Sequence, residues 1–246
     1  MHRINIFLLF VGATFLFAGF SDVRAGDAWN YKRQLDSEAE GWVTRVQAPL
    51  LIPPRAACRD AHWQGIDLSM CYMAGAICTG AQLQGAHLIG INFQRAVLDG
   101  ANLENATVWN ANFKEADLSH ANLRMASLSG SSLVAANLSE VNLAKADLRD
   151  ADFRGAILDR ANLSGADLRK ADFRSAVLNG AVLSGARLND ADFTNAVLSG
   201  AILTGADLSA VKGLRAAQVK STVIDKTTRF PADFGGDLPQ AESSSN

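Results

Sequence analysis

The sequence predicts an all-β fold: a parallel solenoid whose chain winds through stacked four-sided coils. Leu or Phe occupies 26 of the 29 positions that lie five residues apart from Leu68 to Leu208, and Ala occupies 24 of the 29 positions two residues earlier. An α-helix turns every 3.6 residues, so a five-residue period would spread these side chains over all of its faces. The phenylalanines of this register share one twenty-residue spacing: Phe93, Phe113, Phe153, Phe173 and Phe193. Four five-residue sides per coil follow, with the Phe rings stacked on one side of the interior.

Each five-residue unit is expected to form one short side and one corner. In Ala161–Gly165 the first and third residues are apolar and the second is polar, which is the alternation of a strand. The last two positions of the units are mostly Ser, Thr, Asp, Asn, Arg or Gly, which favour turns. Glycine recurs at the last position, where a tight corner can require a positive φ.

Units of the form A(D/N)LXX make the chain similar to the pentapeptide-repeat family. The resemblance covers residues 65–211 and implies a right-handed quadrilateral parallel β-helix of about seven coils, with short non-repeat caps at both ends. In such a solenoid Ala fits the tight inner position near each corner. Leu and Phe fill the axis and form a continuous core that no single repeat could bury.

Residues 1–25 are expected to be a cleaved signal peptide. Arg3 precedes an apolar run that ends at Phe20, and Val23 and Ala25 are residues that signal peptidases accept near the cleavage site. The alternative is an uncleaved membrane anchor, but about 17 residues interrupted by Gly and Thr are short for a span of about 20. The sequence therefore predicts a periplasmic or secreted protein with no stable membrane anchor after cleavage.

Two non-repetitive segments flank the repeat, and we interpret each as a cap on an exposed coil edge. The N-terminal segment, residues 26–64, holds three of the four Trp residues; the alternative role for it is a docking arm. The C-terminal cap, residues 212–234, has apolar residues at helical spacing, which predict a short helix. A helix at this end is a dimer contact in some relatives, so the resemblance leaves a homodimer open. Residues 235–246, with their Gly, Pro, Glu and Ser, are expected to be disordered.

Three cysteines remain in the predicted mature chain: Cys58, Cys71 and Cys78. Export to an oxidising compartment predicts a disulfide among them. Cys71 and Cys78 take inward positions of the repeat and could equally be small buried hydrophobes. Cys58 precedes the expected repeat, so the expected bridge joins Cys58 to Cys71 and ties the cap to the first coil. A zinc site with His62 is disfavoured, because inward-facing ligands in a packed axis are poorly placed for it.

No motif for catalysis, cofactor binding or metal binding interrupts the repeat. The predicted mature chain has three histidines and lacks a Gly-rich phosphate loop and a nucleophile motif. Neighbouring carboxylates such as Asp150 and Asp152 take outer positions, where a solvated charge costs little. We therefore expect a protein that is not an enzyme and that holds no cofactor or metal.

Some cytoplasmic pentapeptide-repeat proteins resemble B-form DNA in charge and width and bind DNA gyrase. Such mimicry needs a strongly acidic face, because the partner's groove is built for phosphates. Residues 66–210 hold 15 acidic and 11 basic residues, which leaves a net charge of only −4. The sequence therefore disfavours gyrase inhibition, and it predicts no binding of nucleic acid.

Protein binding is the function that the outer surface favours. Second positions of the units become apolar in the late coils, on the side after the Phe ladder and on the next side. The twenty-residue spacing stacks five of them into one exposed patch: Ile157, Val177, Val197, Val182 and Ile202. Such a patch is typical of a partner surface, although β-branched residues also suit any strand.

Two functions from different classes follow from this surface. The first is an exported, non-enzymatic scaffold that binds another protein of unknown identity. The alternative is a module that binds envelope polysaccharide or peptidoglycan. Sugar binding favours exposed aromatic side chains in a groove, and Trp109 is the only Trp within the repeat. The scaffold is therefore the preferred prediction.

Overall fold

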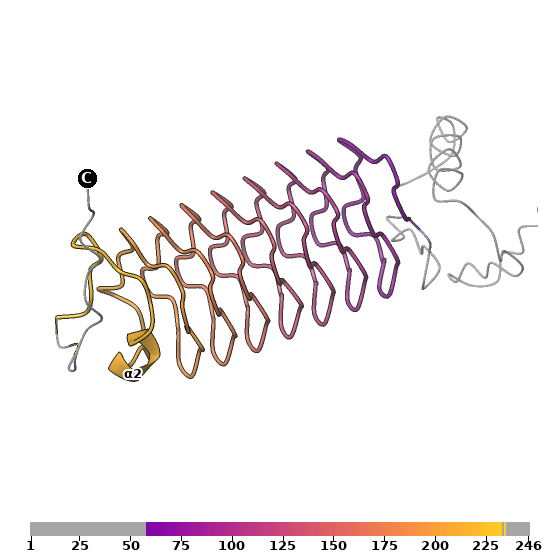
Figure 1. Ribbon diagram of the computed structural model, residues 1–246. Coiled ribbons are helices and arrows are strands. Elements are labelled where there is room, and N and C mark those ends of the chain that lie inside the picture. The colour runs from indigo at the N-terminus through magenta and orange to yellow at the C-terminus, as the bar shows by residue number, and fades with distance from the viewer. Residues whose placement is uncertain (1–57, 233, 235–246) are drawn as a thin grey trace, which may run out of the picture. The chain divides into compact units, whose positions relative to one another are not determined.

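The structure, a computed structural model, describes residues 58–232 and residue 234. These residues wind through a stack of similar coils that runs from the indigo end to the yellow end in Figure 1. Each side of a coil contributes one bridging residue, flanked by turns, so the sheets consist of single bridges rather than long strands. The helix of this described part is α2 (Ala216–Val219).

The register of the coils is set by parallel bridges that join each side to the same side of the next coil. His62 pairs with Gln82, Gln82 pairs with Asn102, and the same step recurs on all four sides as far as the pair of Asp192 with Lys212. This register confirms the four-sided coil that the spacing of the Phe residues predicts. Each side therefore lies directly over the same side of the coil before it.

Backbone hydrogen bonds join each coil to both of its neighbours. The amide of Val97 donates to the carbonyl oxygen of Ala76 in the preceding coil, at 2.8 Å, and the amide of Leu98 donates to Asp117 in the following coil, at 2.6 Å. The same alternation recurs along the ladder. Because the backbone groups of one coil depend on the next, a coil at either end needs another partner.

The interior is filled as the repeat predicts. The Leu and Phe side chains at the centre of the units are almost completely buried from Leu83 onward. The Phe rings stack along the axis, with ring centroids 5.5 Å apart for Phe93 and Phe113, and 4.8 Å apart for Phe153 and Phe173. The rings are stacked at about the spacing of the coils. Each Phe therefore packs on another Phe wherever the next coil also has Phe at this position.

The repeat begins earlier than the expected boundary at residue 65. Cys58 and Trp63 occupy the central inner position of two units and are buried, and His62 already forms a bridge to the next coil. The expectation relied on Leu or Phe at the centre of a unit. Cys and Trp fill the same position here, so the start of the repeat was placed too late.

The last residue of each unit forms the corner, and its φ lies between 51° and 69° from Asp60 to Gly205. Glycine adopts this left-handed conformation without steric cost. Several units place a larger residue there, such as Lys145 with a φ of 59° and Arg160 with a φ of 56°. The corner therefore requires a left-handed backbone but accepts charged side chains.

The C-terminal end of the stack is closed by α2 and by one glutamine. The regular ladder stops where the helix begins, and the later bridges, from Ile202 to Val223 and from Asp207 to Arg229, depart from the regular register. The Nε2 group of Gln218 donates to the carbonyl oxygens of Phe193, at 2.9 Å, and Ala196, at 2.8 Å. Gln218 thus binds the Ala196 carbonyl, whose counterpart Ala176 accepts from the next coil in the regular ladder, and adds a second donor to the Phe193 carbonyl, which already accepts from the Ala196 amide at 3.0 Å.

The cap makes a testable prediction about Gln218. Gln218→Met keeps the length of the side chain but removes the donor of the Ala196 carbonyl, while the Phe193 carbonyl keeps its bond from the Ala196 amide. We expect the last coil to be destabilised by about 1–3 kcal/mol, because a buried carbonyl that loses its donor bears a desolvation cost. Hydrogen exchange of the last coil should report the loss. The exposed Lys226→Met is the control, and equal exchange rates in the two variants would contradict the role of Gln218.

Within the described residues, no helix is long and apolar enough to cross a membrane. The expected signal peptide, residues 1–25, lies outside the described residues. The same holds for residues 26–57 of the expected N-terminal cap and for the expected disordered tail, residues 235–246. These assignments stay predictions.

Candidate functional site: an apolar face on the C-terminal coils

The five apolar side chains expected to form a partner surface lie in two adjacent columns. On one side of the coils Ile157 bridges to Val177 and Val177 bridges to Val197; on the next side Val182 bridges to Ile202. Ile157 and Val197 are each 43% exposed, and the other three are partly exposed. The structure therefore brings all five residues together on the outside of the late coils.

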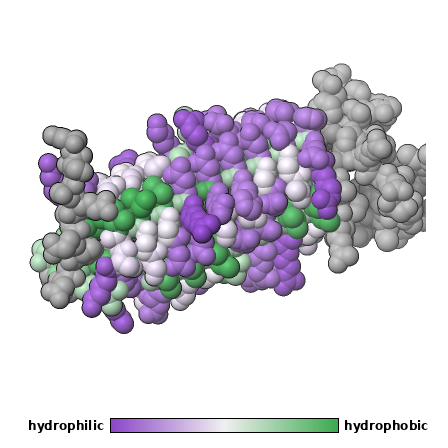
Figure 2. Space-filling model, in the orientation of Figure 1, coloured by the Kyte–Doolittle hydropathy of each residue, from purple (hydrophilic) through white to green (hydrophobic). Residues whose placement is uncertain are grey.

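A sixth residue, Val223, extends the second column because it bridges to Ile202 from within the C-terminal cap. Sequence reasoning missed it, since the cap shifts it out of the repeat's regular register. We call these six residues the apolar face. Figure 2 shows hydrophobic side chains gathered toward the C-terminal end of the coils, beside a surface with many hydrophilic ones.

Polar groups around the apolar face are bonded to one another. The hydroxyl groups of Ser184 and Thr204, on successive coils, lie 2.7 Å apart. The backbone amide of Asn179 donates to the Oδ1 atom of Asp159 at 3.2 Å. Ser184 and Thr204 add no charge and bond to each other, so this part of the surface can lose its water at low cost, whereas Asp159 places a carboxylate at its border.

The other two sides of the same coils carry paired charges. Each of four arginines binds the aspartate two residues before it, with distances between Nη2 and Oδ2 of 2.6–2.7 Å: Asp147 with Arg149, Asp152 with Arg154, Asp167 with Arg169, and Asp172 with Arg174. The hydrogen bond from Arg149 is the main cause of the lowered pKa of Asp147, and that from Arg169 acts in the same way on the pKa of Asp167. A guanidinium group thus lies against each of the four carboxylates and offsets its charge.

This pairing bears on DNA mimicry. A DNA-like surface needs unpaired negative charge spaced along the rod. Here a guanidinium group sits on each of the four aspartates, and Arg154 also approaches Asp172 of the next coil, with Nε 3.7 Å from Oδ2. The late coils therefore present a mixed surface on these sides rather than an acidic stripe.

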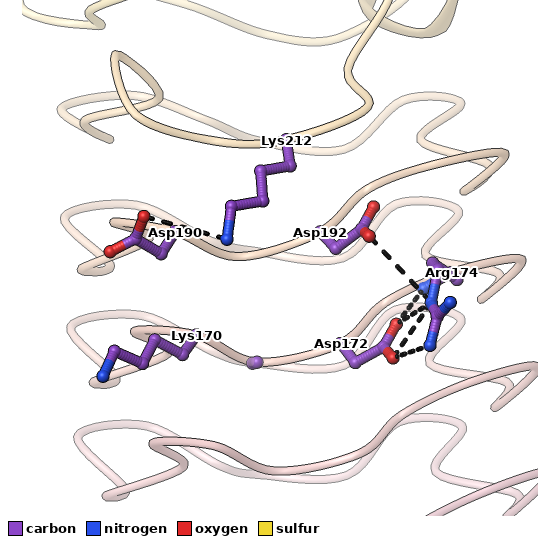
Figure 3. A pocket seen from close by; sticks show the side chains of 7 residues that line it. Lys170, Asp172, Arg174, Asp190, Asp192 and Lys212 are labelled. Atoms are coloured by element: carbon purple, nitrogen blue, oxygen red, sulfur yellow. Dashed lines mark hydrogen bonds and ion pairs between the residues drawn. The ribbon is translucent and has the colours of Figure 1, made fainter.

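A shallow hollow lies on the charged sides (Figure 3). It is lined by Ala171 and six charged residues: Lys170, Asp172, Arg174, Asp190, Asp192 and Lys212. Arg174 binds Asp172 at 2.6 Å and approaches Asp192 at 3.9 Å, while Lys212 approaches Asp190 at 3.9 Å. No nucleophile paired with a base lines it. The described residues also contain no group of three or more His, Cys, Asp or Glu placed to hold a metal ion.

A second charged cluster lies on the middle coils, around His120. Its Nδ1 atom is 2.8 Å from Asp99 and its Nε2 atom is 3.8 Å from Glu140. The hydrogen bond to Asp99 is the main cause of the raised pKa of His120. The cluster is exposed, and its contacts join side chains of successive coils.

The disulfide differs from the expected pair. Cys58 is bonded to Cys78, with their Cα atoms 4.4 Å apart, and Cys71 is buried at another inner position. The expected bridge from Cys58 to Cys71 is therefore wrong. Cys58 and Cys78 are separated by one full coil, so they occupy the same position on successive coils, whereas Cys71 lies on a different side. The period of one coil could have identified the pair if the repeat had been extended to Cys58.

The disulfide joins the first described coil to the second and should stabilise that end of the stack. Cys78→Ala opens a covalent loop with a sequence separation of 20 residues. In the chain-entropy account, such a loop contributes about 3 kcal/mol. We expect the variant to unfold at lower denaturant concentration, and the wild type in dithiothreitol to shift in the same direction. Mass mapping of unreduced peptides should find Cys58 with Cys78; a Cys58–Cys71 peptide would contradict the assignment.

The geometry defines a class of protein: a β-solenoid with a closed interior and a patterned outer surface. The family model described as Pentapeptide repeats matches in 8 copies, over residues 55–88, 76–108, 96–133, 136–174 and 176–212. The chain belongs to the pentapeptide-repeat family. Its coils therefore form a right-handed quadrilateral β-helix, which is the fold of this family.

Solved structures of the family are similar to this chain. HetL, a pentapeptide repeat protein involved in heterocyst differentiation regulation in the cyanobacterium Nostoc, is 32% identical, with 70% of this chain and 86% of HetL covered and a TM-score of 0.38. A variant of QnrB1, a plasmid-mediated fluoroquinolone resistance protein, is 23% identical over 65% of this chain and 81% of that one, with a TM-score of 0.40. The comparison with curated proteins gave no match.

Proposed function

We propose that this protein is an exported, non-enzymatic scaffold that binds another protein through the apolar face. The observation that carries the proposal is the exposure of stacked β-branched side chains, with Ile157 and Val197 each 43% exposed. Apolar side chains that stack on a rigid sheet can bind a partner without ordering a loop first, which limits the entropic cost of association. Proteins of this repeat family are in general structural or interaction proteins.

Export is supported by two independent features of the chain. Residues 1–25 have the charge, apolar run and small residues of a signal peptide. The bond between Cys58 and Cys78 suits the periplasm or the extracellular space, because cytosolic thiols are kept reduced. Both features support a protein that acts outside the cytoplasm.

The alternative of polysaccharide binding has less support. Trp109 and Tyr72 are both exposed, at 46% and 41%. Tyr72 bridges to Asn92 and Asn92 bridges to Asn112, so Tyr72 lies two coils before the coil that holds Trp109. At about 4.8 Å per coil, the two rings are offset by about 10 Å along the rod, so they do not stack in one column.

Site-specific photo-crosslinking tests the proposal in cells that export the protein. A photoreactive amino acid at Val197 should give an adduct with a protein, and the chain in that adduct should begin at Gly26. Val177→Asp should reduce the adduct at least tenfold, because it places a charge in the contact. The fold accepts this change, since Asp117 occupies the same column. The control is a photoreactive residue at Asn102, on the second column but outside the apolar face.

A protein adduct at Val197 that is absent at Asn102 supports the proposal. Equal labelling at the two positions, or none at Val197, would contradict it. A chain that still carries residues 1–25 would contradict export as a soluble protein, independently of the crosslinking result.

A further inference from the structure

We propose that a second exposed apolar surface, on the first coils, binds residues 49–54 of this same chain. The surface consists of Met70, Tyr72, Ile89 and Trp109, and we call it the aromatic corner. It lies where two sides of the rod meet, on the sides that carry the Asp–Arg pairs in the late coils. It is therefore separate from the apolar face, and the inference does not depend on the proposed function.

Hydrogen bonds between successive coils bring the aromatic corner together. The amide of Met70 donates to the carbonyl oxygen of Ile89, and the amide of Gly90 donates to the carbonyl oxygen of Trp109, each at 2.8 Å. A Cβ on Gly90 would lie 2.5 Å from the Sδ atom of Met70. The thioether of Met70 therefore lies along the corner, over Gly90 of the next coil. Tyr72 stands two residues after Met70, on the adjoining side.

A buried hydroxyl group holds the turn that presents Trp109. In the regular turns the first amide of a unit donates to the carbonyl oxygen three residues earlier. Here the hydroxyl of Ser131, from the next coil, accepts from the amide of Ala111 at 3.1 Å and donates to the carbonyl oxygen of Val108 at 2.7 Å. Ser131 is buried, so this turn is fixed from the interior. A contact through Trp109 needs little further ordering of its backbone.

The aromatic corner is uncharged, in contrast to the same corner of the late coils. Asp, Glu, Lys, Arg and His are absent from the segments that form it: residues 68–73, 88–93 and 108–113. The corresponding positions of the late coils include charged residues: Arg149, Asp150, Asp152, Lys170 and Asp172. Charge lies at the borders of the aromatic corner, with Asp67 and His87 on one side and Lys114 on the other. An uncharged, narrow occupant therefore fits this surface, because a charged one would lose water without gaining a partner.

Residues 49–54 have the matching chemistry. Their sequence, Pro-Leu-Leu-Ile-Pro-Pro, is apolar and uncharged, and it ends four residues before Cys58. Proline has a fixed φ, so a segment with three prolines loses less freedom on binding. Proline-rich segments also bind well to exposed Trp and Tyr rings. A surface that bends around a corner suits one narrow chain of this kind better than it suits a flat sheet.

The length of the chain before Cys58 allows this contact. Leu50 precedes Cys58 by eight residues, which span up to about 26 Å. The aromatic corner lies on the first three described coils, within about 20 Å of Cys58 over the surface of the rod. Beyond Trp109 the same column continues with Ser129 and Arg149. The exposed apolar residues of this corner are therefore confined to the coils that the segment can reach.

Oxidation by hydrogen peroxide tests the inference on the processed chain, residues 26–246. This chain has three methionines: Met70, Met73 and Met125. Met70 is 65% exposed, Met125 is 46% exposed and Met73 is buried. Because residues 49–54 cover the aromatic corner, Met70 should oxidise about tenfold more slowly than Met125, the reverse of the order that exposure on the coils predicts. Mass spectrometry of peptides measures both rates.

Variants of the segment show whether it is the source of the protection. Leu50→Ser/Ile52→Ser should raise the oxidation rate of Met70 about tenfold and leave that of Met125 unchanged. The matched control, Val43→Ser/Val46→Ser, changes apolar residues outside 49–54 and should behave like the wild type. A Met70 that oxidises as fast as Met125 in the wild type would overturn the inference. So would a Met70 that stays equally protected in Leu50→Ser/Ile52→Ser.

A variant of the aromatic corner tests the other side of the contact. Tyr72→Asn/Trp109→Ser introduces the residues that the next coil has at Asn92 and Ser129, so the coils should fold normally. Met70 should again oxidise about tenfold faster, while the buried Met73 stays protected and reports an intact first coil. No change at Met70 would overturn the inference. Protection of Met70 that rises with protein concentration would also overturn it, because the occupant would then be a second copy.

Discussion

The structure depends on the hydrogen bonds between successive coils. A coil of this size buries too little apolar surface to be stable alone, and its backbone groups point along the rod toward the coils above and below. The amide of Val97 and that of Leu98 illustrate this, since adjacent residues donate in opposite directions. Each coil is therefore stabilised mainly by the two coils next to it, and the end coils, which have one such neighbour, are the least stable.

Different chemistry protects the two ends that the structure describes. At one end, the bond between Cys58 and Cys78 holds two coils together covalently. At the other, Gln218 supplies a donor to the Ala196 carbonyl, whose counterpart in an earlier coil accepts from the next coil. An unprotected edge would offer a template for pairing with another chain. The caps therefore leave the sides of the rod, rather than its C-terminal edge, as the surface for interaction.

The same register explains why the outer surface is divided into distinct faces. Residues twenty apart in the sequence lie above one another on the same side of the rod. A residue type therefore forms a continuous column only when the sequence repeats it one full coil later. In the late coils the chain does so with aspartate and arginine on two sides, and with Ile and Val on the other two. The inward residues repeat from coil to coil along each side, so the outer residues can vary without altering the fold. The proposed function uses this freedom.

The sequence alone was sufficient for the parts of the molecule that repeat. The inward Leu and Phe, the left-handed corners and the stacked Phe rings all follow from periods of five and twenty. Cys58 and Trp63 were missed because they fill a central position with other residue types. Gln218 and Val223 were missed for a different reason: the helix adds residues to the coil, so these two fall outside the register and only their contacts reveal their roles.

The most direct test of this account is a measurement of the register of the coils itself. Asn122 and Asn142 bridge each other on successive coils, so Asn122→Cys/Asn142→Cys should form a disulfide rapidly on mild oxidation, because neighbouring strands lie about 4.8 Å apart. Asn122→Cys/Asn137→Cys places the second cysteine on a different side of the rod, so this pair should stay reduced. Rapid bonding of the second pair, or equal rates for both pairs, would contradict a coil of four five-residue sides.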